Sequence, residues 1–289
     1  MTVTDVPLAN PSPATARRRG RGIVPVIPAL AVVVLVFVIP VLALLLRSVL
    51  EPEPGLQNYA AFFGSTTYLK VLGNTFLVAG TVTLATVLLG FPVAWFLAIA
   101  PSFWSRLLFA IIILSMWTNL LARTYAWMVL LQRTGIINRT LMDLGLISEP
   151  LPLINNLAGV TIGMTYIMLP FMILPLHATI RAIDPAVFQA AALCGASRWQ
   201  AFTRVMLPLA ASGIAAGALM VFVMSLGYFI TPALLGGTSN MMLAELIAQL
   251  VQSLLDWGLA GAAALVLLVV TLAIYLVQLR FFGFGQARS

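Results

Sequence analysis

The sequence predicts an all-α integral membrane protein whose chain crosses the bilayer six times. Of its 289 residues, 62% are hydrophobic and only 8% are charged, whereas soluble domains carry about 25% charged residues. Its apolar runs are long enough to span a bilayer, which takes roughly 20 residues per helix. These runs are continuous and do not alternate with period two, so they predict helices rather than the strands of a barrel.

Six apolar runs are the predicted spans. They cover Ile23–Leu46, Val71–Ile99, Leu107–Leu131, Leu157–Ile180, Val205–Ile230 and Trp257–Leu279. They divide the chain into a basic tail at 1–22, a six-span domain at 23–282 and a short tail at 283–289. Glycine pairs at Gly159–Gly163 and Gly213–Gly217 predict close packing of the fourth and fifth spans.

The positive-inside rule predicts that both termini face the cytoplasm. With this orientation ten basic residues lie in cytoplasmic segments and four lie outside. The outer four are Arg47, Lys70, Arg133 and Arg139. The net charge of +7 is concentrated in "RRRGRG" before the first span. We interpret this run as a topology anchor at anionic lipid headgroups, so the charge predicts no nucleic-acid partner.

The residue inventory excludes most catalytic chemistry. The chain has one histidine (His177), one lysine (Lys70) and one cysteine (Cys194). It therefore has no HExxH zinc site, Walker A motif or internal disulfide. We expect no cofactor, no metal site and no ATP hydrolysis by this chain, and we interpret Cys194 as a small packing residue.

A single charged residue, Arg123, falls within a predicted span, in the stretch "WTNLLARTYAWMVLL". Counted from Leu107 along a straight helix, it lies about 24 Å towards the outside. Two roles are open: a structural anchor that snorkels to the interface, and a residue that faces a central pathway. All eight acids lie in loops or at span ends, which argues against a proton- or sodium-coupled carrier.

The segment between the fourth and fifth spans predicts two short helices. Asp184 is a good N-cap and Pro185 a favoured first helical residue. Ala190, Ala191 and Ala192 are strong helix formers, and Gly195 then interrupts the pattern.

Ala196 and Ser197 follow the glycine, and a second helical stretch, "RWQAFTRVM", leads to Leu207 and Pro208. Small residues on an exposed face favour a docking element. The alternative is an amphipathic helix that lies on the membrane surface.

The same segment carries the spacing Q-A-A-x-x-x-G, nine residues, then V-x-L-P, formed by Gln189, Ala190, Ala191, Gly195, Val205, Leu207 and Pro208. This spacing resembles the E-A-A-x-x-x-G-x9-I-x-L-P loop of permease subunits of bacterial ABC importers. Valine for isoleucine is a minor departure. Glutamine for glutamate removes a negative charge, so a salt bridge at position 189 is not carried over.

The resemblance implies a type I importer fold in a bacterial inner membrane, and a coupling loop that docks on a separate ATPase. The coupling loop (residues 181–208) would act through Asp184, Gln189, Ala190, Ala191, Gly195, Ala196, Ser197, Leu207 and Pro208. The implied partners are two ATPase copies, a second permease, a periplasmic substrate-binding protein and membrane lipid. The outer segments Gln132–Asn156 and Thr231–Asp256 would meet the binding protein, the first through a short amphipathic helix that includes "LMDLGLI".

Over residues 57–280, the stretches "RTYAWMVLL" and "LGYFITPALLGG" and the coupling loop together resemble the polyamine permeases, specifically their first membrane subunit. Permeases for opines, aminoalkylphosphonates and ferric iron look similar and stay open as alternatives. A secondary carrier, which needs no coupling loop, and a membrane enzyme are the rival classes. Aromatic and hydroxyl groups can guide a cation, so the candidate pathway residues are Trp117, Arg123, Tyr125, Tyr228 and Thr231.

Overall fold

The computed structural model describes residues 27–282, and every regular element in that range is a helix. The first span consists of α1 (Ile27–Val33), a π-helical turn (Val34–Val38) and α2 (Ile39–Leu50). The other α-helices are α3 (Gln57–Gly64), α4 (Thr66–Ile99), α5 (Ser102–Trp117), α6 (Leu120–Leu131), α7 (Ile136–Asp143), α8 (Leu157–Arg181), α9 (Pro185–Leu193), α10 (Arg198–Ala201), α11 (Leu207–Leu226), α12 (Ile230–Leu235), α13 (Leu243–Gln252) and α14 (Trp257–Phe282). The predicted tails at 1–22 and 283–289 lie outside the described residues.

The prediction of an all-helical membrane protein is confirmed. Five helices within the described range are long and apolar enough to cross a bilayer: Pro28–Leu50, Thr66–Ile99, Leu157–Arg181, Arg198–Leu226 and Trp257–Gln278. A bent pair of helices supplies the sixth crossing if it counts as one span.

The prediction of a continuous third span over Leu107–Leu131 is wrong. Helix α5 ends at Trp117, and it meets the segment Leu120–Asp143 at 101°. Thr118 and Asn119 are extended, and the Asn119 Oδ1 accepts hydrogen bonds from the Leu121 N–H at 2.9 Å and the Ala122 N–H at 3.2 Å. An N-cap of this kind starts a new helix, which is the physical reason for the break.

The predicted bounds of the fifth span are also wrong. The helix begins at Arg198, ahead of the predicted Val205, and it ends at Leu226. The Tyr228 N–H donates to the Ser225 carbonyl in a turn, and a separate short helix, α12, starts at Ile230. Tyr228 therefore lies in a linker and not in a membrane-spanning helix.

Helices α4, α8 and α11 pack against one another and form the main core. One face of α8 carries Met164, Met168, Met172 and Leu176, all with fully buried side chains. Residues four apart lie on the same face of a helix, so this spacing makes α8 the central helix of the core.

The glycine pairs let neighbouring helices approach α8 closely. A Cβ atom at Gly213 would lie 2.5 Å from the Thr179 hydroxyl, and one at Gly217 would lie 2.6 Å from the Met172 sulfur. This confirms close packing of the fourth and fifth spans at Gly213 and Gly217. Gly163 instead faces α12, because a Cβ atom added there would lie 2.5 Å from the Leu235 Cδ1.

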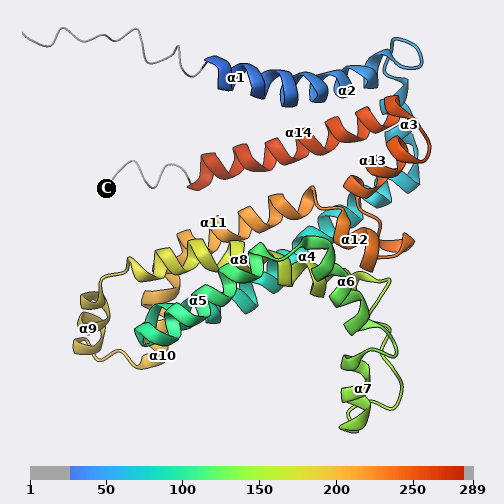
Figure 1. The fold of residues 1–289 in the computed structure, drawn as a ribbon. Helices are drawn as coiled ribbons and strands as arrows, with labels where there is room; N and C mark the ends of the chain where they lie inside the picture. Colours follow the sequence, from blue (N-terminus) through green and yellow to red (C-terminus); the bar gives the residue numbers. More distant parts are fainter. Residues whose placement is uncertain (1–26, 283–289) are drawn as a thin grey trace, which may run out of the picture.

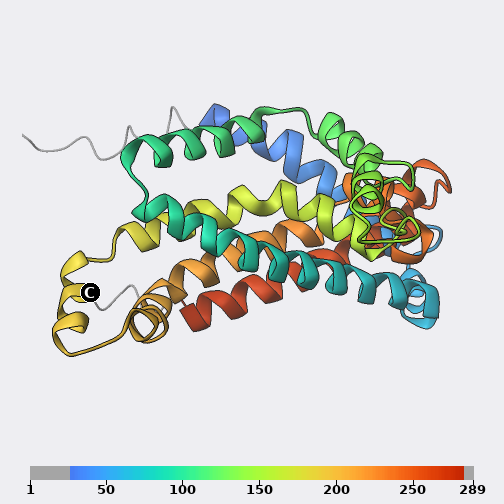
Figure 2. The ribbon, with the colours of Figure 1, turned by 90° about the horizontal axis from the view of Figure 1, so that it is seen from below.

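The two ends of the bundle differ (Figure 1). Helices α9 and α10 lie at one end, together with the start of α1 and the end of α14, while α3, α7, α12 and α13 gather at the other. Helices α5 and α14 lie on opposite sides of the core (Figure 2). The coupling loop and the two segments predicted to be outside are therefore at opposite ends.

Candidate functional site

The coupling loop begins with a capped helix directly after α8. The Asp184 Oδ1 accepts a hydrogen bond from the Ala186 N–H at 2.8 Å, and Pro185 is the first residue of α9. Both features are as predicted. Only Ala182, Ile183 and Asp184 separate α8 from α9, so no long linker lies between the two helices.

Helix α9 ends in a Schellman motif centred on Gly195. The Gly195 N–H donates to the Ala192 carbonyl at 3.0 Å, and the Ala196 N–H donates to the Ala191 carbonyl at 3.0 Å. Gly195 has φ +79°, a left-handed conformation that is costly for residues with a Cβ. The predicted interruption at Gly195 is confirmed, and its physical cause is backbone geometry.

The second helical stretch starts at a capping box. The Ser197 Oγ accepts from the Gln200 N–H at 3.3 Å, and the Gln200 Oε1 accepts from the Ser197 N–H at 2.9 Å. Helix α10 then continues through a π-helical turn (Phe202–Met206) into α11, whose first turn contains Leu207 and Pro208. The prediction of a second separate helix is therefore corrected: this stretch is the beginning of the fifth span.

The surface of the coupling loop carries large apolar side chains. Leu193 is 90% exposed and Trp199 is 71% exposed, and Gln189 and Ala190 are also exposed. Cys194, the C-cap residue of α9, is exposed as well, so its interpretation as a packing residue is wrong. The exposure of these large apolar side chains is the observation that favours an interaction surface on the loop.

An aromatic cluster, which the sequence alone did not predict, attaches the coupling loop to α4. The Trp199 ring stacks on Phe202 at 5.6 Å between centroids. Phe202 in turn contacts Trp95 at 5.3 Å and Phe91 at 5.9 Å, both on α4. The aromatic residues on either side are visible in the sequence, but nothing local links them across the chain.

A second candidate site is a cavity of about 220 Å³ between α5, α6, α8 and the end of α11. Arg123 and Tyr228 both line it, and the Arg123 Nε is buried without a hydrogen-bond partner in the part of the chain that the structure describes. Thr231 lies close by, with its hydroxyl 3.3 Å from that of Thr124. The remaining lining residues are Met116, Leu120, Ile167, Met168, Phe171 and Met224.

The structure brings together only part of the predicted pathway set. Trp117 is 85% exposed and lines a different groove, and Tyr125 is 49% exposed and lines none of the described cavities. The straight-helix count that placed Arg123 about 24 Å from Leu107 is wrong, because α6 restarts at Leu120 and does not continue the axis of α5.

The residues that line this cavity are poorly suited to hold a cation by themselves. It contains one arginine, three methionines and two aromatic rings, and it contains no carboxylate. The aromatic faces of Phe171 and Tyr228 can attract a cation, but the Arg123 charge repels it. The lining residues therefore supply no negative charge that could hold a cation.

The two segments predicted to lie outside are held by hydrogen bonds, the first within itself and the second to α4. In the first, helix α7 spans Ile136–Asp143, so it ends within the "LMDLGLI" stretch and the predicted helix is displaced. The buried Asn138 holds this segment by hydrogen bonds with Gln132 and Leu151. In the second, the Thr75 hydroxyl of α4 accepts from the Leu243 N–H at 2.8 Å, at the start of α13.

Comparison with known families gives a match over most of the chain. Residues 23–282 match the family described as binding-protein-dependent transport system inner membrane component. This match covers all residues that the structure describes.

Three relatives illustrate the similarity. The spermidine/putrescine transport system permease protein PotB of Escherichia coli K12 is 36% identical over 225 residues, which are 78% of this chain and 82% of the relative. The inner membrane ABC transporter permease protein YdcU of the same strain is 39% identical over 199 residues, 64% of this chain and 63% of the relative. A putative ferric transport system permease protein, FbpB 1 of Haemophilus influenzae, is 27% identical over 125 residues, 43% of this chain and 20% of the relative.

Among solved structures, a chain of a bacterial alginate ABC transporter, in complex with an alginate pentasaccharide-bound periplasmic protein, has a similar fold. The TM-score is 0.74, with 90% of this chain and 94% of that chain covered and 19% sequence identity. At this identity the likeness concerns the fold alone.

Proposed function

The chain belongs to the family of binding-protein-dependent transport system inner membrane components, and from this premise we propose that it is a permease subunit of an ATP-driven polyamine importer. It is a multi-pass protein of the inner membrane. The observation that carries the substrate class is the 36% identity to a spermidine/putrescine permease over 78% of the chain. The similarity to a ferric permease covers only 43% of the chain, so a different solute is less well supported.

In this proposal the coupling loop docks on a separate ATPase subunit, which hydrolyses ATP. The exposed Leu193 and Trp199 supply apolar contacts, and the capped ends of α9 keep the loop in one conformation, so little entropy is lost on docking. The family motif residues Gln189, Ala190 and Gly195 lie on the same short helix and its C-terminal turn. At position 189 a glutamine amide replaces a carboxylate, so contacts there rely on neutral hydrogen bonds.

Three connections would carry the ATPase movement into the membrane. The loop continues into α8 through Asp184 and into α11 through α10. It reaches α4 through the stacked rings of Trp199 and Phe202, which contact Trp95. Since α4, α8 and α11 form one core, a displacement of the loop would move that core as a unit.

The translocation path is proposed to form between this chain and a second permease, with two ATPase copies and a periplasmic binding protein completing the importer. The cavity at Arg123 and Tyr228 is the part of the path that this chain contributes. The segments around α7, α12 and α13 form the end opposite the coupling loop (Figure 1), where the binding protein would dock.

Co-purification of the ATPase tests the docking proposal. Leu193→Asp places a charge on a side chain that is 90% exposed, so it removes no packing within the chain. Leu144→Asp is the matched control, because Leu144 is 67% exposed and lies in the segment at the opposite end. We expect the tagged Leu193→Asp chain to lose the ATPase and the Leu144→Asp chain to retain it. Retention of a coupled ATPase by Leu193→Asp would contradict the docking site.

Thermal stabilisation of the partner binding protein tests the substrate class. Putrescine and spermidine are compared with an opine, an aminoalkylphosphonate and a ferric chelate. A true ligand at a hundredfold excess over its dissociation constant stabilises the protein by about 2.7 kcal/mol. Stabilisation by polyamines alone is the expected result. Stabilisation only by an anionic ligand would refute the polyamine assignment and leave the coupling proposal intact.

A further inference from the structure

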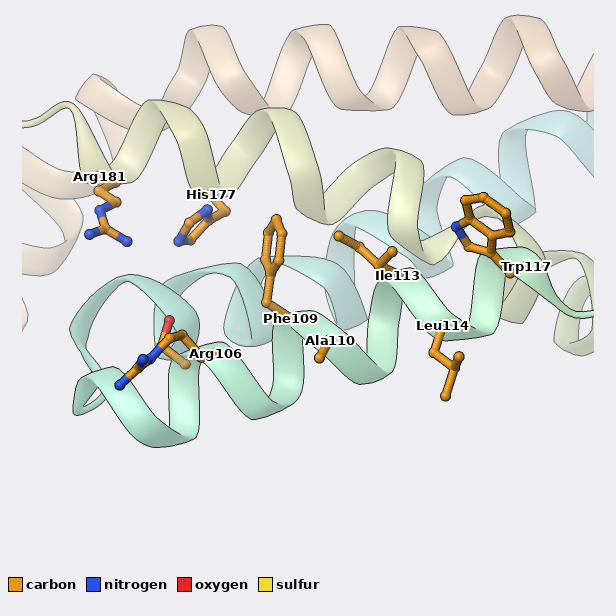
Figure 3. A pocket seen from close by; sticks show the side chains of 9 residues that line it. Arg106, Phe109, Ala110, Ile113, Leu114, Trp117, His177 and Arg181 are labelled. Carbon is orange, nitrogen blue, oxygen red and sulfur yellow. The ribbon is translucent and has the colours of Figure 1, made fainter.

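A groove of about 690 Å³ lies between α5 and α8, separate from the Arg123 cavity (Figure 3). Helix α5 lines one wall with Ser105, Arg106, Phe109, Ala110, Ile113, Leu114 and Trp117, and helix α8 lines the other with His177 and Arg181. The polar and the apolar residues of the groove are segregated. His177, Arg106 and Arg181 gather at one end, and Trp117 lies at the other.

The polar end of the groove carries positive charge that no acidic lining residue neutralises. Arg106 and Arg181 are both exposed, and no carboxylate lines the groove. Over residues 27–282, the ion pair found is the one between Arg47 and Glu51, far from this site in the sequence. The His177 Nε2 is buried with no hydrogen-bond partner among the described residues, and its ring lies against Phe109 at 5.8 Å between centroids. The Arg106 Nε donates to the Ser102 carbonyl at 2.9 Å, so the donors that this end offers to an anion are the other N–H groups of Arg106 and those of Arg181.

The rest of the groove is apolar over a length that suits an acyl chain. Trp117 lies eleven positions after Arg106 on α5, which corresponds to about 16 Å at 1.5 Å per residue. Half of a bilayer hydrocarbon core is about 15 Å. The cationic end lies near the start of α5 and the end of α8, and Arg181 is the last residue of the candidate span Leu157–Arg181.

We propose that this groove binds an anionic phospholipid from the leaflet on the side of the coupling loop. The phosphate-bearing headgroup lies against Arg106, Arg181 and His177, and one acyl chain extends along Phe109 and Ile113 to Trp117. Arginine binds phosphate oxygens through paired N–H donors, and the exposed apolar walls are covered by the acyl chain. A polyamine does not fit this site, because both arginines repel a cation.

The position of the headgroup connects the lipid to the coupling loop. Arg181 is the last residue of α8, and Asp184 caps α9 three residues later. A lipid that joins Arg181 to Arg106 holds the end of α8 against the start of α5. The groove is thus placed to restrain the same helix end that the coupling loop moves.

Tryptophan quenching locates the acyl chain. The complete transporter is reconstituted in nanodiscs of phosphatidylcholine with a small fraction of phosphatidylglycerol that carries bromine atoms near the acyl-chain ends. We expect quenching in the wild type that exceeds the quenching in Trp117→Phe, and unbrominated phosphatidylglycerol should reverse the excess. Equal quenching in both proteins, or equal quenching by brominated phosphatidylcholine, would overturn the site.

Lipid retention measured by native mass spectrometry tests the headgroup contacts. Each basic residue near an anionic headgroup contributes about fivefold in affinity, so Arg106→Gln/Arg181→Gln should retain phosphatidylglycerol about thirtyfold more weakly. Arg133→Gln/Arg139→Gln is the matched control, since both arginines are exposed at the other end of the bundle, and it should bind as the wild type does. Unchanged retention in the first variant would overturn the proposal. The proposal would also be overturned if the isolated chain retained phosphatidylglycerol and the complete transporter did not, because a partner subunit would then occupy the groove.

Discussion

Gly195 offers a test of whether its role in the coupling loop is one of backbone geometry. Its φ of +79° places it in the left-handed region, and a Cβ added there would meet nothing within 4 Å. An alanine at this position therefore costs only backbone strain within the chain, about 1–2 kcal/mol. If this strain shifts the conformational equilibrium of the loop away from the conformation that docks, the affinity of the chain for the ATPase falls about five- to thirtyfold.

The comparison of alanine with asparagine makes the test decisive. Asparagine is larger than alanine but adopts the left-handed region more readily. Backbone strain predicts that affinity decreases in the order glycine, asparagine, alanine. Steric exclusion by the ATPase surface predicts the order glycine, alanine, asparagine. Titration of the detached ATPase against the three variants in detergent distinguishes these orders, and a weaker Gly195→Asn than Gly195→Ala would refute the backbone explanation.

Three further predictions concern the helical bundle. Gly217→Ala should destabilise the chain by about 1–3 kcal/mol, because its Cβ would lie 2.6 Å from the Met172 sulfur and 3.2 Å from the Met172 carbonyl. Thermal unfolding should show no such loss for Gly80→Ala, whose Cβ meets nothing within 4 Å. Asn119→Ala should cost about 1 kcal/mol through loss of the α6 cap, and an unchanged unfolding midpoint would contradict that assignment, while Asn119→Asp should keep the cap. Burial raises the pKa of Glu245, so its contribution to stability is present below the ordinary carboxyl pKa and is lost as the pH rises through the folded value. In the wild type the unfolding temperature should therefore decline as the pH rises from 4.5 towards neutral, and Glu245→Gln should make this decline smaller. The same decline in both proteins would exclude the Glu245 carboxyl as its cause.

Features governed by neighbouring residues could be predicted from the sequence. The start of α9 follows from Asp184 and Pro185, and its end follows from Gly195, because caps depend on side chains within a few positions of the helix end. The break before α6 also had a local signal, since Asn119 is a good N-cap. The continuous apolar character of the run nevertheless favoured one straight span, and hydrophobicity does not reveal a change of helix direction.

Features that depend on distant parts of the chain could not be predicted. Arg106 and Arg181 are 75 positions apart, and only the packing of α5 beside α8 places them on one groove. The contact of Phe202 with Trp95 likewise depends on how α11 and α4 meet. For Cys194 the local prediction was wrong. Its small apolar side chain and its small neighbours predicted packing, but the side chain is exposed at the end of α9.

The distribution of charge bears on how a polyamine importer could select its substrate. In the cavity that we propose as this chain's part of the path, Arg123 is the one charged lining residue and no carboxylate lines it. The half-buried Arg123 opposes a bound cation, and more strongly where the surroundings have a low dielectric constant, so this cavity would disfavour a resting polyamine. Tight recognition then has to come from the binding protein and the second permease, and weak binding within this chain has a physical advantage. In the proposed importer, a cation that is held loosely here would be released when the ATPase closes the coupling loops, whereas a carboxylate in the cavity would retain it.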